Sequence, residues 1–522
     1  MDTMVEIDSG KLAGLRRRDG LAFLGIPYAD DTARTRFAAP QAPQPWAGVR
    51  HADALGERCP QTVENIVHLP VFAWYGQDSG FGENCCVLNV FTPDLRPQAR
   101  RPVIVYVHGG GYSSGGGGGA ALDGGRLAAF GDVVVVTLNH RLNVFGYSPL
   151  AALGDEGFAD AGHAGQLDLI AALRWVQRNI AAFGGDAGCV TLAGQSGGGN
   201  KLMTLLVMPE AQGLFHRVIN MSGVSGLRLA QPQDTQAYVH EWLRRLGIGA
   251  NELHRLRALP GEALQRARQE AMVAVRGDGT QPVVDGRHVQ AQPFGDEGLA
   301  MQAQVPMLMG STDSESTLFL AQEPRHLAID ETELLARIEA TFSLDRPRAL
   351  ALVASYREQA DVRSAVDVLV QLSSDVLTRA HLIHAAERKA AAGGAPVFLY
   401  NFAWQLEVDG GIWRSPHTMD IPFAFGTLAC ARGMLGETLP AADETARRFM
   451  GAFVAFARHG DPSHADLPRW PRYDTHRRAT MVFDAHCRVV DDYRAAGRIA
   501  SAPLALWPPI RLTRGPLFRG LG

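Results

Sequence analysis

The sequence has little lysine and little cysteine, and it lacks long apolar runs. Only three of its 50 Lys and Arg residues are lysines, namely Lys11, Lys201 and Lys389. Its six cysteines show no C-x-x-C spacing and no H-E-x-x-H segment occurs, so the common zinc motifs are excluded. No apolar run reaches the roughly 18–20 residues that cross a bilayer. We therefore expect neither a disulfide-stapled miniprotein, nor a metal site, nor a membrane-inserted segment.

Composition and charge narrow the class further. The 522 residues are 46% hydrophobic and 20% charged, which is ordinary for a folded protein and excludes a disordered chain. The formal net charge is −4 and the arginines are scattered, so no basic face and no nucleic-acid partner are expected. Asp2, Glu6 and Asp8 stand where a secretion signal has a basic and then an apolar region, so we expect a cytoplasmic protein.

Short apolar runs rich in β-branched residues alternate with helical patterns. The runs that predict buried strands are 103–107, 133–138, 189–193, 218–221, 305–309 and 397–400. Helical periodicity covers 167–183 and 200–208. This alternation predicts an α/β fold with a central, mostly parallel, twisted sheet and helices on both faces. The stretch of about 325–395 has helical patterning without strand signals, and we interpret it as a helical insertion.

Two segments match G-x-S-x-G, the pattern of a strand–turn–helix elbow that exposes a serine. In a chain with 57 glycines about 0.3 matches are expected by chance, so context has to separate them. Ser196, within Gly194–Gly198, follows a predicted strand and precedes a predicted helix. Ser113 is followed by the glycine run 115–119, which cannot hold a helix. We predict Ser196 as a nucleophile and Ser113 as a chance match; a plain glycine-rich turn is the alternative for Ser196.

A second glycine segment, His108–Gly111, directly follows the strand predicted at 103–107. H-G-G-G after a strand is typical of an oxyanion hole, whose backbone N–H groups stabilise a tetrahedral intermediate. A phosphate-binding loop is the competing interpretation. It is excluded because these glycines do not fit G-x-G-x-x-G and the chain contains no G-x-x-x-x-G-K-[ST]. A flexible loop without a catalytic role stays open as an alternative.

With these two motifs the chain resembles the type-B carboxylesterases, the cholinesterase-like branch of the α/β-hydrolases. The resemblance covers nearly the whole chain and rests on further segments. They are Gly25–Ala29, Arg36–Phe37, Trp46, Glu83–Cys85, Leu88–Val90, Asn139–Leu142, Ala172–Gln177, Phe183–Asp186, Trp470–Pro471 and Tyr473. The resemblance implies an α/β-hydrolase fold with helical insertions over the active site. It also implies hydrolysis of small-molecule carboxylic esters without a metal or an organic cofactor.

The resemblance implies the other members of a catalytic triad. The family's acid lies in G-x-x-x-D-E-G, which here reads Gly310–Ser316 and makes Glu315 the acid, with Asp313 as its rival. The family's histidine lies in H-x-x-E before an aromatic Phe-Gly, and His417 fits that segment. The order of Ser196, Glu315 and His417 along the chain is the order expected of this fold.

In the mechanism that the resemblance implies, His417 takes the proton of Ser196, whose oxygen attacks the ester carbonyl, and Glu315 orients the imidazole. The expected oxyanion donors are the backbone N–H groups of Gly110, Gly111 and Gly197. The further positions that we single out are Gln195 and Ser222 beside the triad, Trp74 and Tyr112 for substrate binding, and the ion pairs Arg36–Glu83 and Arg141–Asp168.

Some residues depart from the family pattern. Gln195 replaces the usual Glu before the nucleophile and removes a negative charge, so we expect a weaker preference for cationic alcohols. Gly197 replaces Ala, which should widen the space at the elbow, and Asp420 replaces Glu in H-x-x-E. Cys59 and Cys85 match positions that secreted members join by a disulfide. In a cytoplasmic protein we expect both as reduced thiols that lie close together.

Other functions stay open from the sequence alone. Amidases and carbamate hydrolases use the same triad, and leaving-group preference depends on the geometry of the pocket. A non-catalytic, cholinesterase-like binding module is a further alternative, against which the complete set of triad residues argues. We expect a monomer or a small homo-oligomer. Because Ser196, Glu315 and His417 must meet, we expect residues 1–522 to form one enlarged domain, although the length alone favours two or more.

Overall fold

The computed structural model describes residues 3–62, 65–77, 79–277, 279–436, 440–504 and 513–520. The chain divides into two compact units. Unit 1 comprises Met1–Asn65, Tyr75–Ile219 and Arg228–Gln302, and unit 2 comprises Ile66–Trp74, Asn220–Leu227 and Ala303–Gly522. Ser196 belongs to unit 1, whereas Glu315 and His417 belong to unit 2, and the expectation of one enlarged domain stays a prediction.

The larger sheet of unit 1 contains, in spatial order, β9 (Gly185–Gln195), β7 (Arg101–Val107), β8 (Val134–Leu138), β6 (Val87–Thr92), β4 (Gly20–Pro27) and β3 (Leu15–Arg17). β7 pairs in parallel with β8 and β9, whereas β6, β4 and β3 continue the sheet in antiparallel fashion. The valine-rich strands β7 and β8 are almost entirely buried, as expected for central strands that are covered on both faces. The strands predicted at 103–107, 133–138 and 189–193 are therefore confirmed.

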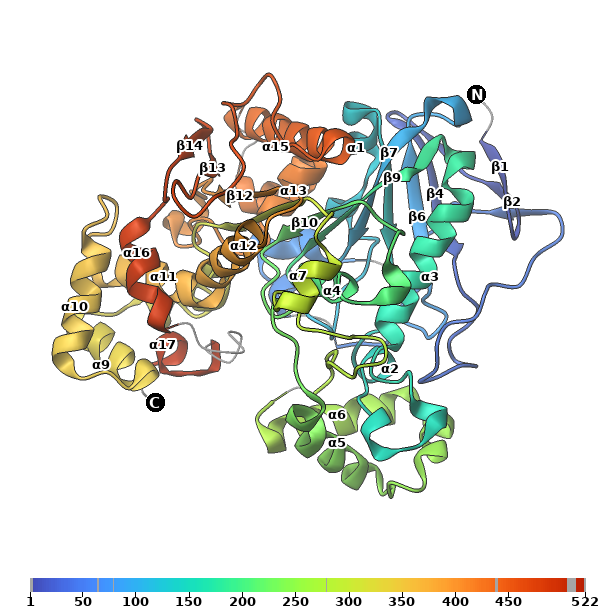
Figure 1. Ribbon diagram of the computed structural model, residues 1–522, viewed down its shortest axis with the longest axis horizontal. Helices are drawn as coiled ribbons and strands as arrows, with labels where there is room; N and C mark the ends of the chain where they lie inside the picture. The colour runs from blue at the N-terminus through green and yellow to red at the C-terminus, as the bar shows by residue number, and fades with distance from the viewer. Residues whose placement is uncertain are drawn as a thin grey trace. The chain divides into compact units, whose positions relative to one another are not determined.

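Unit 1 also holds a three-stranded sheet and several helices. The small sheet contains β1 (Met4–Ile7), β2 (Gly10–Ala13) and β5 (Val49–His51). The helices are α1 (Gly125–Gly131), α2 (Asn143–Gly146), α3 (Ala164–Asn179), α4 (Gly197–Leu205), α5 (Pro232–Leu246), α6 (Gly261–Val275) and α7 (Asp296–Met301). α5 and α6 pack side by side at one end of the unit (Figure 1), where Trp242 Nε1 donates to the carbonyl of Leu264 at 3.2 Å.

The two helices predicted in unit 1 are present with shifted bounds. α3 ends at Asn179 and continues as a 3-10 turn over Ile180–Phe183, so that the two together cover the predicted 167–183. α4 begins at Gly197 rather than at the predicted Asn200, and it ends at Leu205. Glycines have low helix propensity, which is why the pattern placed the start too late. Close packing of these glycines against neighbouring backbone accounts for a first turn that propensity does not favour.

The sheet of unit 2 contains β11 (Met307–Thr312), β12 (Val397–Phe402), β13 (Thr480–Phe483) and β14 (Arg488–Val490). β11, β12 and β13 are parallel neighbours, and β14 pairs antiparallel with β13. The strands predicted at 305–309 and 397–400 are confirmed with shifted bounds. β10 (Arg217–Met221) corresponds to the strand predicted at 218–221, and the division between the units falls within it.

The stretch predicted to be helical contains α9 (Glu331–Phe342), α10 (Arg346–Arg357), α11 (Ala365–Ser374) and α12 (Ala380–Ala392), with a π-helical turn at Asp375–Arg379. α16 (Ala495–Ser501) lies against α10, and α17 (Pro516–Arg519) lies against α9 (Figure 1). The other helices of unit 2 are α8 (Thr317–Leu320), α13 (Asp420–Phe425), α14 (Arg432–Leu435) and α15 (Pro440–His459). An insertion of this stretch over the active site stays a prediction.

Among the residues that the structure describes, no helix is both long enough and apolar enough to cross a membrane.

Candidate active site

Ser196 lies at the sharp turn between β9 and α4. Its backbone has a φ of 55° and a ψ of −121°, a conformation that costs a non-glycine residue free energy. Glycines close the turn on both sides. A Cβ on Gly194 would lie 2.7 Å from the carbonyl carbon of Gly198, and a Cβ on Gly198 would lie 2.0 Å from the carbonyl oxygen of Val107. The backbone around Ser196 therefore has the geometry of the predicted elbow.

The H-G-G-G loop leaves the end of β7 and passes beside this elbow. Gly110 and Gly111 have φ values of 84° and 61°, in the left-handed region that glycine adopts without strain. The carbonyl of Gly110 accepts hydrogen bonds from the N–H groups of Ser113 and Ser114 at 3.1 and 3.0 Å. Because the C=O and N–H of a trans peptide are coplanar and point in opposite directions, these bonds fix the direction of the Gly111 N–H.

The three predicted oxyanion donors are available. Within the part of the chain that the structure describes, the N–H groups of Gly110, Gly111 and Gly197 donate no hydrogen bond to another protein group. Two of these glycines are in contact, since a Cβ on Gly197 would lie 2.2 Å from the oxygen and 2.3 Å from the nitrogen of Gly111. Gly197 is also the first residue of α4, where the helix dipole favours negative charge.

The contact between Gly197 and Gly111 corrects one expectation. The sequence suggested that glycine at 197, in place of the family's alanine, widens the space at the elbow. The backbone of Gly111 instead fills the volume that a methyl group would occupy. The expectation was wrong because it treated the loop as fixed, whereas two glycines that face each other allow their backbones to approach.

Glu315 follows β11 in unit 2 and is completely buried. Its Oε1 accepts hydrogen bonds from the N–H of Thr312 at 2.8 Å and from the hydroxyl of Ser222 at 2.6 Å. Its Oε2 is hydrogen-bonded to Nδ1 of His417, whose side chain is partly exposed. A carboxylate at Nδ1 holds the imidazole proton on that nitrogen and leaves Nε2 as the base. Unit 2 thus brings together three of the predicted residues, Glu315, His417 and Ser222.

Asp313, the rival for the acid, has different partners. Its two carboxylate oxygens accept from Arg494 at 2.9 and 2.8 Å, and Oδ1 also accepts from the hydroxyl of Tyr493 at 2.9 Å. Burial acts to raise the pKa of Asp313, but the charge and hydrogen bonds of Arg494 outweigh it and hold the pKa below its ordinary value. Asp313 is therefore the anion of a buried ion pair, which favours Glu315 as the acid.

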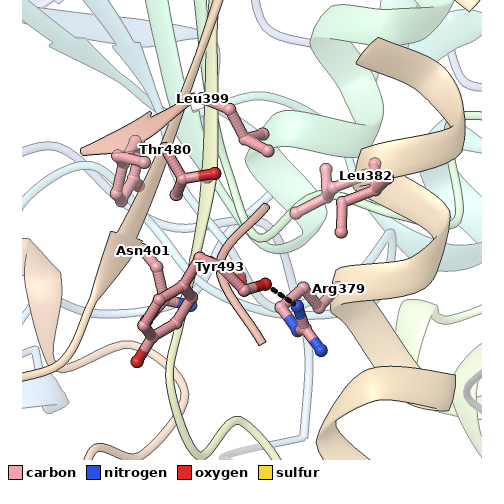
Figure 2. Close-up of a pocket in the computed structure, with 10 residues that line it drawn as sticks. Arg379, Leu382, Leu399, Asn401, Thr480 and Tyr493 are labelled. Carbon is pink, nitrogen blue, oxygen red and sulfur yellow. Dashed lines mark hydrogen bonds between the residues drawn. The ribbon is translucent and has the colours of Figure 1, made fainter. Parts of the chain in front are cut away.

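A small cavity in unit 2 lies between β11, β12 and α12 (Figure 2). Arg379, Asn401 and Thr480 line it, and Arg379 Nη1 donates to the carbonyl oxygen of Tyr493 at 2.8 Å. Its volume of about 20 Å³ has room for roughly one water molecule. An ester substrate is larger than this cavity.

Asp420, which follows His417 in the H-x-x-E segment, is a second buried carboxyl of unit 2. The hydroxyl of Tyr400 donates to its Oδ2 at 3.0 Å, and Oδ1 has no hydrogen-bond partner among the described residues. Burial, followed by the negative charge of Glu315, raises the pKa of Asp420 to about 7. The sequence identified Asp420 only as a departure from the family. Its protonation depends on burial and on a residue far away in the chain, for which no local pattern gives a signal.

Three other predicted residues are buried within their units. Gln195 is completely buried at the end of β9. Tyr112 packs in a hydrophobic cluster of unit 1, with the ring of Tyr147 at 4.9 Å. Trp74 belongs to unit 2, and its Nε1 donates to the carbonyl of Val71 at 2.9 Å. These contacts do not test a role in substrate binding, which stays a prediction for Tyr112 and Trp74.

Both predicted ion pairs are present in unit 1. Arg36 Nε donates to Glu83 at 2.6 Å, and Arg141 donates to Asp168 through Nε and Nη2 at 2.8 and 2.6 Å. The second pair is completely enclosed, with the Arg141 and Asp168 side chains 2% and 0% exposed. Because Arg141 follows β8 and Asp168 lies on α3, this pair anchors the helix to the segment after the strand.

The six cysteines all lie in the described residues, and none of them is joined in a disulfide there. Cys59 and Cys85 are both buried, and Cys59 Sγ accepts from the N–H of Leu142 at 3.2 Å. A hydrogen bond with Cys59, together with burial, raises the pKa of the Cys85 thiol. The two thiols are therefore neighbours, as the sequence analysis expects.

Comparisons with known proteins identify the family of this chain. The model of the carboxylesterase family matches residues 1–500. The chain is 31% identical to the para-nitrobenzyl esterase of Bacillus subtilis over 495 residues, which cover 94% of this chain and 96% of that protein. A solved carboxylesterase of Geobacillus stearothermophilus is 33% identical, with a TM-score of 0.81 over 95% of this chain and 99% of that one. A solved esterase of Clostridium hathewayi, whose description says that it can hydrolyse aliphatic aromatic polyesters, is 31% identical, with a TM-score of 0.81 over 96% and 98% of the two chains.

Proposed function

The chain belongs to the carboxylesterase family, and from that premise we propose that Ser196, His417 and Glu315 form its catalytic triad. Family membership makes the chain a carboxylic ester hydrolase with the α/β-hydrolase fold. The hydrogen bond between His417 Nδ1 and the fully buried Glu315 carries the assignment of the residues. It gives the histidine the tautomer that a general base for serine requires.

In the proposed reaction, Nε2 of His417 accepts the proton of Ser196 Oγ as that oxygen attacks the ester carbonyl carbon. The carbonyl oxygen becomes an oxyanion, and the three glycine N–H groups are its proposed donors, each typically contributing about 2.7–4 kcal/mol. His417 then protonates the leaving alcohol, the ester C–O bond breaks, and an acyl-enzyme remains on Ser196. His417 next deprotonates water, which attacks the acyl carbon. The carboxylic acid leaves as Ser196 recovers its proton, and Glu315 stabilises the imidazolium in both steps.

Labelling with a fluorophosphonate, followed by peptide mapping, tests the nucleophile. We expect one adduct, on Ser196, and none in the Ser196→Ala variant. Ser113→Ala, which removes the other G-x-S-x-G serine, is the matched control and should still be labelled at Ser196. An adduct on Ser113 would overturn the assignment of the nucleophile. An adduct on no serine would overturn it as well and would return the non-catalytic binding module as the better interpretation.

Two conservative substitutions distinguish the acid. In Glu315→Gln we expect kcat to fall by roughly 10³–10⁴-fold, because the amide no longer stabilises the imidazolium or fixes its tautomer. Asp313→Asn removes the anion of the pair with Arg494, so it should lower stability while leaving far more of the activity. The reverse result, with Glu315→Gln active and Asp313→Asn inactive while still folded, would make Asp313 the acid.

Substrates with matched acyl groups test the bond that is cleaved. A p-nitrophenyl ester, a p-nitroanilide and a p-nitrophenyl carbamate of the same size separate ester, amide and carbamate hydrolysis. We expect the ester to have the highest kcat/KM. A higher kcat/KM for the anilide or the carbamate would favour the amidase or carbamate hydrolase alternative, which uses the same triad.

A cytoplasmic location and a monomeric or small homo-oligomeric state complete the proposal. Cell fractionation tests the location, and sedimentation velocity of the full chain tests the assembly. Recovery of the protein outside the cell, or as a large particle, would contradict the respective prediction.

A further inference from the structure

The helix that follows the nucleophile carries a fully buried lysine. Lys201 lies in the second turn of α4, has no exposed surface, and is one of only three lysines in the chain. Lysine is almost never fully buried, because an ammonium that leaves water loses a large solvation free energy. A lysine kept at such a position indicates that its ammonium makes contacts that the site needs.

One of these contacts is with the oxyanion loop. Lys201 Nζ donates to the carbonyl oxygen of His108 at 3.1 Å, and His108 is the first residue of H-G-G-G. The hydrogen bond therefore joins the helix that begins at Ser196 to the loop that supplies the proposed oxyanion donors. Hydrogen bonds from a charged donor are roughly twice as strong as neutral ones, so this contact is suited to holding the loop in position.

The imidazole of His108 in turn contacts the carbonyl of the next residue, Gly109. Its Nδ1 lies 2.9 Å from the carbonyl oxygen of Gly109. A carbonyl oxygen only accepts, so Nδ1 carries the proton in this contact. Holding the Gly109 carbonyl fixes the plane of its peptide, and the N–H at the other end of that plane belongs to Gly110, a proposed oxyanion donor. Lys201 thus acts on Gly110 through His108 and Gly109.

Burial and the charge of Lys201 favour the neutral form of two nearby histidines, His108 and His140. The rings of His108 and His140 are both buried, with centroids 4.8 Å apart. Burial, followed by the positive charge of Lys201, lowers the pKa of both histidines well below the ordinary value, and the arginines Arg58 and Arg141 act in the same direction. A neutral His108 has one ring proton, and the Gly109 carbonyl holds it on Nδ1.

We propose that Lys201 is a positioning residue of the oxyanion hole, whose ammonium holds the His108 carbonyl so that the H-G-G-G loop and the Ser196 elbow keep one relative geometry. The proposal rests on the proposed function, since it concerns the donors of that mechanism. Lys201 is not a catalytic residue in it, because its only role is to orient Gly110 through the two preceding residues.

The test compares Lys201→Met with Lys389→Met in the full-length enzyme. Methionine is a long, unbranched and uncharged side chain that cannot donate a hydrogen bond. Lys389 on α12 of unit 2 is also buried, 1% exposed, so its substitution is the matched control for losing a buried lysine. For Lys201→Met we expect kcat on a p-nitrophenyl ester to fall about 10–100-fold, below the loss for deleting a whole donor, with KM changed less than about 2-fold. For Lys389→Met we expect kcat and KM close to wild type.

A transition-state analogue separates positioning from a general loss of structure. A trifluoromethyl ketone adds to the serine and places an oxyanion in the hole, whereas the corresponding methyl ketone binds mainly as a ground-state ligand. In Lys201→Met the inhibition constant of the first should rise by the same factor as kcat falls, and that of the second should stay unchanged. Lys201→Gln, which keeps a neutral donor, should lie between Lys201→Met and wild type in both measurements. If Lys201→Met does not fold, the kcat and the inhibition constants of Lys201→Gln test the proposal instead.

The outcomes distinguish this proposal from the proposed function. If the wild type is not labelled by the fluorophosphonate at Ser196, the proposed function fails. If the wild type is labelled and a folded Lys201→Met or Lys201→Gln has wild-type kcat and analogue affinity, only the role of Lys201 is refuted. Equal losses in Lys201→Met and Lys389→Met, or equal weakening of the two ketones, would also refute it, because these results describe a structural effect.

Discussion

Replacing Asp420 by asparagine should change how the stability of the protein depends on pH. The carboxyl of Asp420 is completely buried beside Glu315 and receives one hydrogen bond, from Tyr400. The charged groups that face it are Glu315 and His417, so ionisation would put a second negative charge next to the first. Asparagine keeps the shape of the protonated side chain and cannot ionise, so Asp420→Asn removes this titration with little change in volume.

The size and sign of the effect follow from the pKa of Asp420 in the two states. The ordinary pKa of 3.8 describes the unfolded chain, and burial with the charge of Glu315 raises the folded pKa to about 7. Between these values the folded protein holds a proton that the unfolded chain has released. The resulting stability is fully present below pH 3.8 and is lost as pH rises through about 7. The difference corresponds to about 4 kcal/mol, using 1.36 kcal/mol for each pKa unit.

Urea unfolding at a series of pH values from about 4.5 to 8.5 measures this effect, because the midpoint and slope give the free energy of unfolding at each pH. We expect Asp420→Asn to gain stability relative to wild type by about 3 kcal/mol between the two ends of this range, since part of the effect lies below pH 4.5. Asp53→Asn, at an exposed aspartate, controls for the substitution itself. A difference between wild type and Asp420→Asn that is the same at low and high pH would refute the reasoning.

Three further predictions test other contacts. In Gly197→Ala the new methyl group would lie 2.2 Å from the backbone oxygen of Gly111 in the H-G-G-G loop. We therefore expect kcat on a p-nitrophenyl ester to fall roughly 100-fold. A wild-type kcat would contradict this prediction. Arg494→Met leaves a buried carboxylate without its cation and should cost about 3–5 kcal/mol in urea unfolding, and a smaller loss than 1 kcal/mol would contradict it. His288 bonds Asp160 and Glu210 through its two ring nitrogens, and the hydrogen bond to Asp160 is the first cause that raises the pKa of His288. The stability that His288 contributes is therefore fully present below the unfolded pKa near 6.5 and is lost as pH rises through the folded pKa. In urea unfolding, His288→Gln should thus lose more free energy of unfolding at pH 6 than at pH 9. An equal loss at both pH values would contradict this prediction.

Features that depend on neighbouring residues were predictable from the sequence. The valine runs at β7 and β8 predict buried strands because hydrophobicity and β-branching act within a few residues. The elbow at Ser196 was predictable for the same reason, since the glycines that permit its backbone are adjacent to it. Glu315 and His417 were identified through the resemblance to a family, because nothing in their own surroundings along the chain distinguishes them from other acids and histidines.

Features that depend on residues far apart in the chain were not predictable. The space beside Gly197 is filled by the backbone of Gly111, which lies in the loop after a different strand, β7. The protonation of Asp420 depends on Glu315, and the position of Lys201 matters only because His108 lies opposite it. Burial, close approach and charge state are properties of the folded assembly, so a pattern within one segment does not contain them.

The two buried carboxyls Glu315 and Asp420 of unit 2 show that a sequence motif identifies residues but does not determine whether they are protonated. Glu315 accepts three hydrogen bonds, from a backbone N–H, from Ser222 and from His417, whereas Asp420 accepts one, from Tyr400. Burial disfavours the charged form of a carboxyl, and few donors around Asp420 offset this effect, so its pKa rises. Below pH 7, therefore, the Asp420 carboxyl holds its proton. The number of donors around each carboxyl, and not its position in the segment, separates Glu315, the proposed acid of the triad, from Asp420, whose pKa is raised.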